Sequence, residues 1–332
     1  MKEKNIRKAK VIKKDNNFPT YVNCLCGLND GRLAIGGNNS LMIYNMKTYK
    51  FDLYLDNQFD IKSIIELSNY RLFYFTYFTE SEGPWVDEII EDQLVEISNN
   101  KYKDLTDTLP LYPRNYNILY EYSETIFITG RYYKEQNNQI EEKIDKLMKI
   151  NNKYRVISRL KLTGLVNFVL LKNNLMAVLI KIKKDKDKYN DNAENYCLNF
   201  YDVRIFKFIK RQNVEKTEII CPLDEKFMFI GTHKGVIIYD YINFKNNKTI
   251  SCQYPLYKIY LFNGFVYIGE TENYDYKLKT CKNRIVEYEY DYKGNLKQIY
   301  SYYKPQNRLK DFIKVKDGRL LTCSEENVKI WK

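Results

Sequence analysis

The sequence contains a single histidine, His233, so any mechanism that needs an imidazole base depends on this residue. It lies in residues 231–235, Gly-Thr-His-Lys-Gly, which are typical of a short hairpin turn. A Ser-His-Asp arrangement requires an imidazole that a buried carboxylate holds in place. A turn instead exposes its side chains to solvent. We therefore interpret His233 as a surface residue and expect no catalytic site.

Metal and phosphate sites find no better support among the residues. Cys24 and Cys26 are the only close pair of cysteines, and on a strand both side chains point to the same face. No second Cys or His cluster lies nearby to complete a zinc site. The other cysteines are scattered, mostly in apolar stretches, which indicates reduced thiols in a core. Gly36-Gly37 lacks the strand-to-helix context of a phosphate-binding loop, so we expect neither a metal nor a cofactor.

Carboxylates gather in one stretch of the chain, at Glu80, Glu82, Asp87, Glu88, Glu91 and Asp92. General acid–base catalysis needs a shielded pair of carboxyl groups whose pKa values are driven apart. This stretch is predicted to be an exposed loop. A solvated acidic patch is therefore expected here.

The 332-residue chain carries a formal net charge of +12. A basic surface attracts phosphate groups, which favours a nucleic-acid partner or an anionic membrane. However, the lysines accompany abundant Asn, Ile, Tyr and Phe, and an A/T-rich genome would produce the same composition. Clustering of the cations on one face would favour the functional interpretation.

No apolar run of 18 residues is present to span a bilayer. Residues 1–14 are charged throughout and lack the apolar core of a signal peptide. We therefore expect a soluble cytoplasmic protein, with the nucleus as the alternative compartment.

Two segments near opposite ends of the chain are closely alike. Residues 28–35 read Leu-Asn-Asp-Gly-Arg-Leu-Ala-Ile, and residues 315–322 read Val-Lys-Asp-Gly-Arg-Leu-Leu-Thr. In both, a turn built on Asp-Gly joins two apolar stretches, which predicts a β-hairpin. A third apolar stretch follows each hairpin, at residues 40–45 and 327–331. A repeated unit of three short strands therefore organises the chain.

The last repeat ends in Ile330-Trp331, where WD40 repeats carry their Trp-Asp pair, and the chain resembles the WD40 family in degenerate form over essentially its whole length. Five more copies lie between the two ends, and the copies recur about every 48 residues, slightly above the ~40 to 45 residues of a WD40 blade. The resemblance implies an all-β fold, a seven-bladed β-propeller of four-stranded antiparallel blades that forms a single domain over residues 1–332. The expected blades are residues 20–55, 60–109, 116–162, 166–212, 217–252, 257–303 and 310–332, the last completed by 8–13.

Only the last copy lacks a fourth strand, because the sequence stops at Lys332 directly after its third. Residues 8–13 precede the first repeat and are available for that role. The resemblance implies that this N-terminal strand closes the propeller and removes an exposed sheet edge. WD40 blades often also carry a Gly-His pair whose His joins a buried hydrogen-bond network. With His233 alone, packing of Tyr, Ile and Leu must hold most of these blades instead.

Insertions between the second and third strands are predicted in four blades, at residues 79–91, 134–144, 183–195 and 271–283. In WD40-like propellers these turns lie on one face, so the resemblance implies that the insertions gather there. Their charged and aromatic side chains are candidates for binding a partner: Glu82, Trp85, Asp87, Glu88, Tyr274, Tyr276, Lys277 and Lys279. Alternatively, the insertions are low-complexity segments without a binding role.

The expected function is that of a non-catalytic scaffold or adaptor for protein–protein interaction, which presents the insertion-bearing face to one or more protein partners. The alternative is a propeller that binds RNA or ribonucleoprotein through its basic, tyrosine-rich surface.

Overall fold

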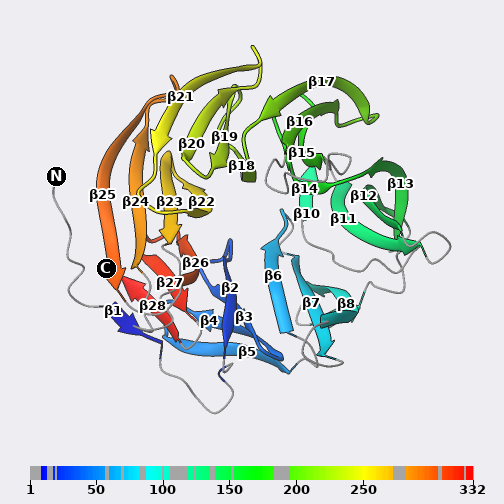
Figure 1. Cartoon of the computed structure of the whole chain (residues 1–332). Coiled ribbons are helices and arrows are strands. Elements are labelled where there is room, and N and C mark those ends of the chain that lie inside the picture. The colour runs from blue at the N-terminus through cyan, green and yellow to red at the C-terminus, as the bar shows by residue number, and fades with distance from the viewer. Residues whose placement is uncertain are drawn as a thin grey trace. The chain divides into compact units, whose positions relative to one another are not determined.

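The computed structural model is built from β-strands, and no helix occurs in the part of the chain that it describes (Figure 1). The high content of Ile, Tyr and Phe favours strands, because these side chains pack well on a pleated surface. The structure describes residues 9–12, 18, 21–56, 60–68, 71–81, 87–98, 101–104, 119–122, 125–134, 139–150, 153–182, 195–271, 282–305, 309–324 and 327–331.

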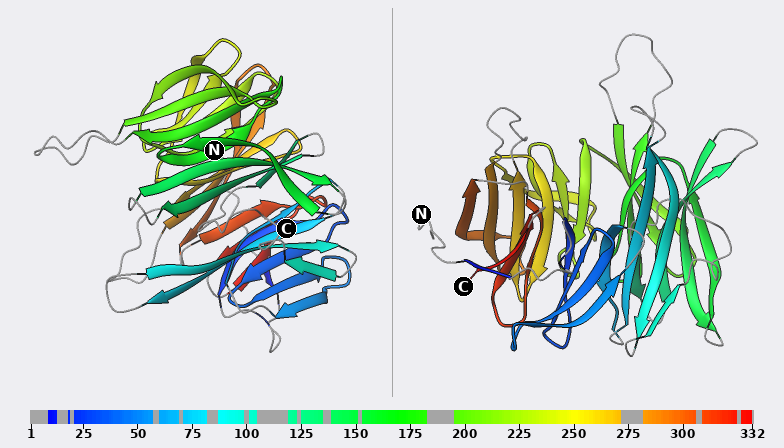
Figure 2. Two further views of the ribbon diagram at one scale, coloured as in Figure 1. Left: turned by 90° about the vertical axis from the view of Figure 1, so that its right-hand side faces the viewer. Right: turned by 90° about the horizontal axis from the view of Figure 1, so that it is seen from below.

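The chain divides into two compact units. Unit 1 comprises Met1–Asn5, Gln139–Ile144 and Ser158–Gln306, and unit 2 comprises Ile6–Asn138, Asp145–Ile157 and Asn307–Lys332. The described strands pair into seven four-stranded antiparallel sheets. In nearly all of them the order in space follows the order in sequence, so each sheet corresponds to one predicted repeat. The side views in Figure 2 show the twist of the individual sheets.

Unit 1 holds three whole sheets, with the orders β14-β15-β16-β17, β18-β19-β20-β21 and β22-β23-β24-β25. The first contains β14 (Leu165–Leu170), β15 (Leu175–Ile182), β16 (Asn195–Asp202) and β17 (Lys207–Val214). The second contains β18 (Thr217–Pro222), β19 (Phe227–Thr232), β20 (Gly235–Asp240) and β21 (Lys245–Ser251). The third contains β22 (Leu256–Phe262), β23 (Phe265–Thr271), β24 (Lys282–Tyr290) and β25 (Leu296–Pro305). The first strands of neighbouring sheets lie against each other, β14 beside β18 and β18 beside β22.

Unit 2 holds the sheets β2-β3-β4-β5, β6-β7-β8-β9 and β1-β28-β27-β26, and the sheet β10-β11-β12-β13 has residues in both units. The strands of the first two sheets are β2 (Val22–Gly27), β3 (Leu33–Gly37), β4 (Ser40–Asn45), β5 (Lys50–Asp56), β6 (Asp60–Glu66), β7 (Leu72–Ser81), β8 (Asp87–Ser98) and β9 (Lys101–Asp104). The others are β10 (Leu119–Tyr122), β11 (Thr125–Lys134), β12 (Gln139–Ile150), β13 (Lys153–Leu162), β26 (Leu309–Lys314), β27 (Leu320–Ser324), β28 (Asn327–Trp331) and β1 (Ala9–Val11). In this unit β2 lies beside both β6 and β26.

The N-terminal strand completes the sheet of the last repeat, as predicted. β1 pairs antiparallel with β28, with Ala9 opposite Trp331 and Val11 opposite Lys329. The backbone N–H of Ile12, a fully buried residue, then donates to the carbonyl oxygen of Val328 at 3.0 Å. The two ends of the chain thus share one sheet, and β28 has no free edge.

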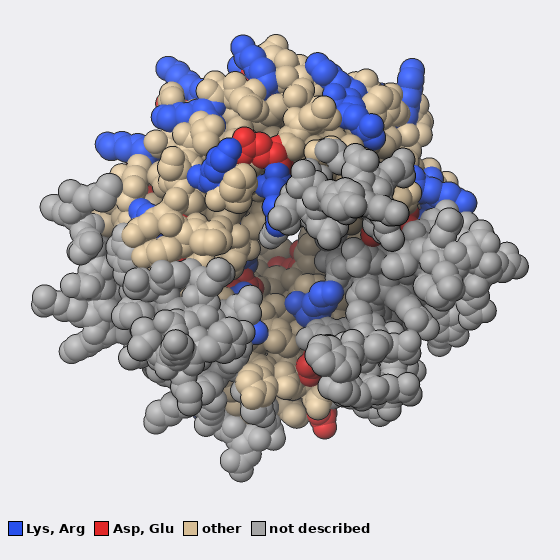
Figure 3. Space-filling view, in the orientation of Figure 1, with Lys and Arg blue, Asp and Glu red and all other residues tan. Residues whose placement is uncertain are grey.

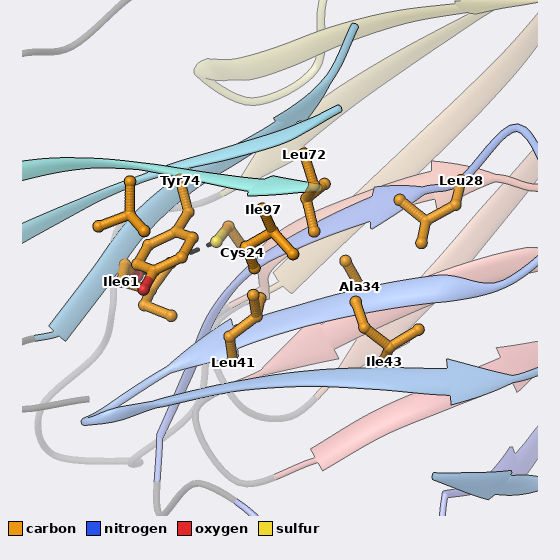
Figure 4. Packing of buried hydrophobic residues seen from close by; sticks show 10 residues of the cluster. Cys24, Leu28, Ala34, Leu41, Ile43, Ile61, Leu72, Tyr74 and Ile97 are labelled. Atoms are coloured by element: carbon orange, nitrogen blue, oxygen red, sulfur yellow. Dashed lines mark hydrogen bonds between the residues drawn. The ribbon is translucent and has the colours of Figure 1, made fainter. Parts of the chain in front are cut away.

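Burial falls from the inner to the outer strands of a sheet. Every residue of β3, β19 and β27 is buried, whereas no residue of β17 is. The core therefore lies between sheets rather than inside one. In unit 2, side chains from the sheets of β2 and β6 form one cluster that includes Cys24, Leu41 and Tyr74 (Figure 4). In unit 1, an equivalent cluster joins β19 and β20 to β23 and β24 through residues such as Phe229, Ile238 and Val286.

A bulge recurs at the same place in most repeats. The register shifts between Val22 and Cys24 in β2 and between Ile61 and Ser63 in β6. The same shift occurs in β14, β18, β22 and β26, and a second one separates the third and fourth strands of four sheets. Because a bulge bends a strand and increases its twist, these common shifts give the repeats a common shape. Alternation of apolar residues could not reveal them.

Two of the predicted loop insertions are wrong in part, because the strands extend into them. β7 continues to Ser81 and β8 begins at Asp87, so most of residues 79–91 belongs to a hairpin. Similarly, β11 runs to Lys134 and β12 begins at Gln139, inside the predicted insertion 134–144. Charged and polar residues interrupt the apolar alternation in both segments, so the sequence pattern did not reveal the longer strands. The predicted insertions at 183–195 and 271–283 fall largely outside the described residues.

Candidate functional site

The structure describes two of the eight predicted partner-binding residues. Asp87 and Glu88 begin β8, where they lie opposite Ser81 and Glu80 of β7. The other six lie outside the described residues: Glu82, Trp85, Tyr274, Tyr276, Lys277 and Lys279.

Asp87 and Glu88 belong to a two-stranded extension of their sheet. β6 pairs with β7 only as far as Tyr77, and β9 pairs with β8 only from Val95. Beyond these limits, residues 78–81 pair with 87–91, and no other described strand pairs with them. We call this segment the acidic ribbon, because it carries Glu80, Asp87, Glu88 and Glu91. It holds the acidic residues in an extended hairpin beyond the four-stranded part of the sheet.

His233 lies where the sequence predicted. Thr232 pairs with Gly235 and closes the turn between β19 and β20, and His233 is exposed in this turn. The side chain of Thr232 donates to the carbonyl oxygen of Gly235 at 3.1 Å, which fixes the turn. A solvent-exposed imidazole lacks the buried carboxylate that a catalytic triad requires. Nor does any group of three or more His, Cys, Asp or Glu residues in the described part of the chain form a potential metal site.

The described cysteines are free thiols, as predicted. Cys24 and Cys26 pack in the cluster between the sheets of β2 and β6, where the thiol of Cys24 approaches the carbonyl oxygen of Ile61 at 3.9 Å. Burial raises the pKa of Cys221 to about 12. Burial, together with the charge of Glu270, does the same for Cys252. Because the thiolate is the nucleophile and the metal ligand, these two thiols are unreactive at neutral pH.

A buried ion pair in unit 1 has a structural role. Glu270 of β23 and Arg284 of β24 lie opposite each other, with 3.6 Å between Oε2 and Nη1. Oε2 of Glu270 also accepts hydrogen bonds from the backbone N–H groups of Gln253 and Tyr254, at 2.8 and 3.1 Å. These bonds hold the connection between β21 and β22. The Glu270 carboxylate thus already binds Arg284 and two backbone N–H groups. We therefore interpret this cluster as a structural contact and not as a ligand-binding site.

Two outer strands of unit 1, β17 and β21, present a basic surface together with the turns that lead into them. Residues 203–214 and 241–251 contain six Lys and Arg residues and no Asp or Glu. These are Arg204, Lys207, Lys210, Arg211, Lys245 and Lys248, all of them exposed. Figure 3 shows Lys and Arg side chains gathered along the edge that β17 and β21 form. We call this area the basic rim. The missing acidic residues were its signal in the sequence.

Three of the basic rim residues also contact other side chains of unit 1. Arg204 binds Asp202 through its Nη2, 2.6 Å from Oδ2, and this contact lowers the pKa of Asp202 to about 2. Nε of Arg211 donates to Oδ1 of Asn199 at 3.0 Å. Nζ of Lys210 lies 4.4 Å from the ring centre of Phe244, which itself packs edge-on against Phe200. The last contact joins β17 to the turn before β21, so the two strands form one continuous surface.

Solved structures share this fold. The chain is similar to a chain in the crystal structure of a mitotic checkpoint complex, with a TM-score of 0.66 and 11% identity over 98% of this chain and 93% of that chain. It is also similar to the Pyrococcus horikoshii acylaminoacyl peptidase, with a TM-score of 0.60 and 11% identity. That match covers 94% of this chain but 51% of the peptidase chain, about half its length. At such identities the likeness shows the fold alone.

The chain therefore has an all-β propeller fold with four-stranded antiparallel blades. No family model matches its sequence, and no curated protein sequence does either. In the described part of the chain, no helix has the length and apolar character needed to cross a membrane.

Proposed function

We propose that this chain is a non-catalytic scaffold for protein–protein interaction. The observation that carries the proposal is the coverage of the structural likeness: the propeller fold accounts for 98% of this chain and for 93% of a chain in a multi-protein complex. Propellers expose a broad surface of turns on a rigid frame, which suits the assembly of other macromolecules.

We further propose that the seven sheets are the blades of one closed propeller of the WD40 type. The support is threefold: the sheets correspond to the repeats in the sequence, neighbouring first strands lie side by side within each unit, and β1 joins the two ends of the chain in one sheet. The side chain of Trp331 also binds Thr322, through Nε1 and Oγ1 at 2.8 Å. This contact joins Trp to a Thr hydroxyl, as in the hydrogen-bond network of the WD40 family that the chain resembles.

The residues proposed to bind a partner are Glu82, Trp85, Asp87 and Glu88, in the acidic ribbon and the segment that joins its strands, and Tyr274, Tyr276, Lys277 and Lys279, in the connection between β23 and β24. Trp85 is proposed as the anchor, because aromatic residues dominate the energetics of interfaces. The carboxylates around it favour a partner with a basic surface.

Affinity purification followed by mass spectrometry tests this proposal with three forms of the chain. One variant replaces residues 79–91 by a two-residue turn and so removes the acidic ribbon with Trp85. A matched control shortens residues 183–194, a segment of similar length between β15 and β16. We expect a reproducible set of proteins that the control retains and the ribbon variant loses. Identical sets from both variants would exclude the acidic ribbon as the interface.

Hydrolysis of acylated peptides is the enzymatic activity to test, since a peptidase is among the structures with this fold. We expect no turnover above buffer. Hydrolysis that disappears in a His233→Ala variant would overturn the non-catalytic assignment, because His233 is the only imidazole in the chain.

A further inference from the structure

Most of the exposed apolar side chains of unit 1 lie in the basic rim, and Tyr292 is the one exception. Five large apolar residues are exposed among the described residues of unit 1, and all five lie on fourth strands or on the turns that lead into them. They are Ile205, Phe208, Ile209, Ile242 and Tyr292. Ile205 is 67% exposed between Arg204 and Lys207, at the tip of the turn into β17. Positively charged and exposed apolar side chains thus lie side by side on this surface.

Simple protection of a sheet edge explains only part of this pattern. Lysines on an outer strand discourage pairing with another chain, and the bulge between Phe200 and Tyr201 does the same for β17. Neither purpose requires exposed isoleucines, which by themselves promote association. The outer strand β5 of unit 2 instead balances Lys50 with Asp52 and Asp56. The outer strands β13 and β25 also lack acidic residues, so what distinguishes the basic rim is that its cations lie beside four exposed apolar side chains.

We infer that the basic rim is a docking surface for an anionic lipid bilayer. Lysine and arginine side chains near such a bilayer are attracted by its negative surface potential, and aliphatic side chains enter the boundary between headgroups and acyl chains. Ile205 and Ile242 are exposed on the turns into β17 and β21, Ile205 between Arg204 and Lys207 and Ile242 three residues before Lys245. Apart from Phe208, the exposed apolar side chains of the rim are aliphatic, and these gain nothing from the stacking on bases that single-stranded nucleic acid requires. The combination therefore fits lipid better than RNA.

The position of the two strands supports a single contact surface. The turn before β21 packs on β17 through Phe244 and Lys210, so Ile242 and Lys245 lie next to the cations of β17. The acidic ribbon belongs to unit 2, and the basic rim to unit 1. Membrane docking and partner capture therefore depend on separate residues, and each can fail without the other.

Vesicle co-sedimentation of the full chain tests the inference. The vesicles are phosphatidylcholine with and without phosphatidylserine, and the variant is Lys207→Glu with Lys248→Glu. The control is Lys47→Glu with Lys50→Glu, which makes the same charge change at exposed positions on β5 and the turn before it. Wild type and control should bind only the phosphatidylserine vesicles. The rim variant should lose at least about tenfold in partition coefficient, because each cation near the surface contributes on the order of 1 kcal/mol.

A second variant, Ile205→Ser with Ile242→Ser, separates insertion from charge. This variant should still bind the vesicles at low salt. At high salt, where screening removes the electrostatic attraction, the fraction of protein that sediments with the vesicles should fall below that of the wild type. Equal loss in the rim variant and the control, or no sedimentation of the wild type, would overturn the inference. So would binding of a single-stranded RNA oligonucleotide that the rim variant loses while wild type ignores the vesicles, because the surface would then be a nucleic-acid site.

Discussion

The backbone N–H of Leu25 donates a hydrogen bond to Oδ2 of Asp311 at 2.9 Å, and this bond joins the sheet of the first repeat to the sheet of the last. Asp311 is buried in β26, and its other oxygen, Oδ1, accepts from the backbone N–H of Phe312 at 2.8 Å. Similar bonds link later sheets. Oε2 of Glu66 accepts from the N–H of Asn29 at 2.5 Å, and Oε2 of Glu121 accepts from that of Ser68 at 2.7 Å.

We expect Asp311→Ala to destabilise the protein by about 2 kcal/mol, because it leaves buried backbone N–H groups without an acceptor. Asp311→Asn keeps one carbonyl oxygen and should cost less. The measurement is the midpoint of urea unfolding. Asp56→Ala removes an exposed carboxylate at the end of β5 and serves as the control, with an expected change within about 0.5 kcal/mol. A cost for Asp311→Ala no larger than that of the control would mean that water replaces the carboxylate.

The contacts of these inter-sheet carboxylates could not be predicted from the sequence. Glu66 and Glu121 occupy the same place in their repeats, one residue before the turn, yet they read as ordinary polar residues on alternating strands. Nothing in a strand pattern states which neighbouring backbone a side chain will meet. The strands themselves were predictable, because turns such as the one at Asp30-Gly31 and alternating apolar residues are local signals.

Some features of the candidate surfaces could also be predicted from local sequence patterns, and others could not. The exposure of His233 and the burial of Cys24 followed from local patterns, and both predictions are confirmed. The acidic ribbon was predicted as a loop, because its charges hid the alternation that extends β7 and β8. The basic rim required knowledge of which strands are outermost and which side chains stay exposed. Those properties depend on the packing of sheets.

Removal of residues 1–14 should lower the thermal unfolding temperature and promote aggregation. The deletion takes away β1 and Ile12, so it exposes the edge of β28 and opens a cavity where the buried Ile12 packed. Ile12→Ala alone should cost about 2 to 4 kcal/mol, as is usual for the truncation of a buried isoleucine. Differential scanning calorimetry and light scattering report the two effects. An unchanged unfolding temperature in the deletion would mean that the closure contributes nothing.

The contact between Trp331 and Thr322 should behave as a coupled pair. Nε1 of Trp331 donates to Oγ1 of the buried Thr322 at 2.8 Å. Trp331→Phe and Thr322→Val each remove the bond, and we expect each to destabilise the protein by about 1 kcal/mol. The double variant should cost less than the sum, with a coupling energy of about 0.5 to 1 kcal/mol from urea unfolding. Additive costs would show that the two side chains contribute independently.

Tyr239 should limit stability at high pH. It is buried in β20, and burial raises its pKa to about 12, with the charge of Asp240 adding to the effect. An unfolded tyrosine titrates near pH 10, so the folded chain holds this proton more tightly. The resulting stability is fully present below about pH 10 and is lost as the pH rises towards 12. Urea unfolding between pH 8 and pH 11 should therefore show a decline that begins near pH 10.

Tyr239→Phe should reduce that alkaline decline and raise stability at pH 7.5 by about 1 kcal/mol. Among the described residues, no group forms a hydrogen bond with the Tyr239 hydroxyl, and a buried hydroxyl without a partner is costly. Tyr267→Phe is the matched control, because the Tyr267 hydroxyl donates to Oε1 of Glu287 at 3.0 Å. Its removal should destabilise the protein by about 1 kcal/mol or more. Equal destabilisation by both variants would mean that the Tyr239 hydroxyl also binds a partner, such as an ordered water.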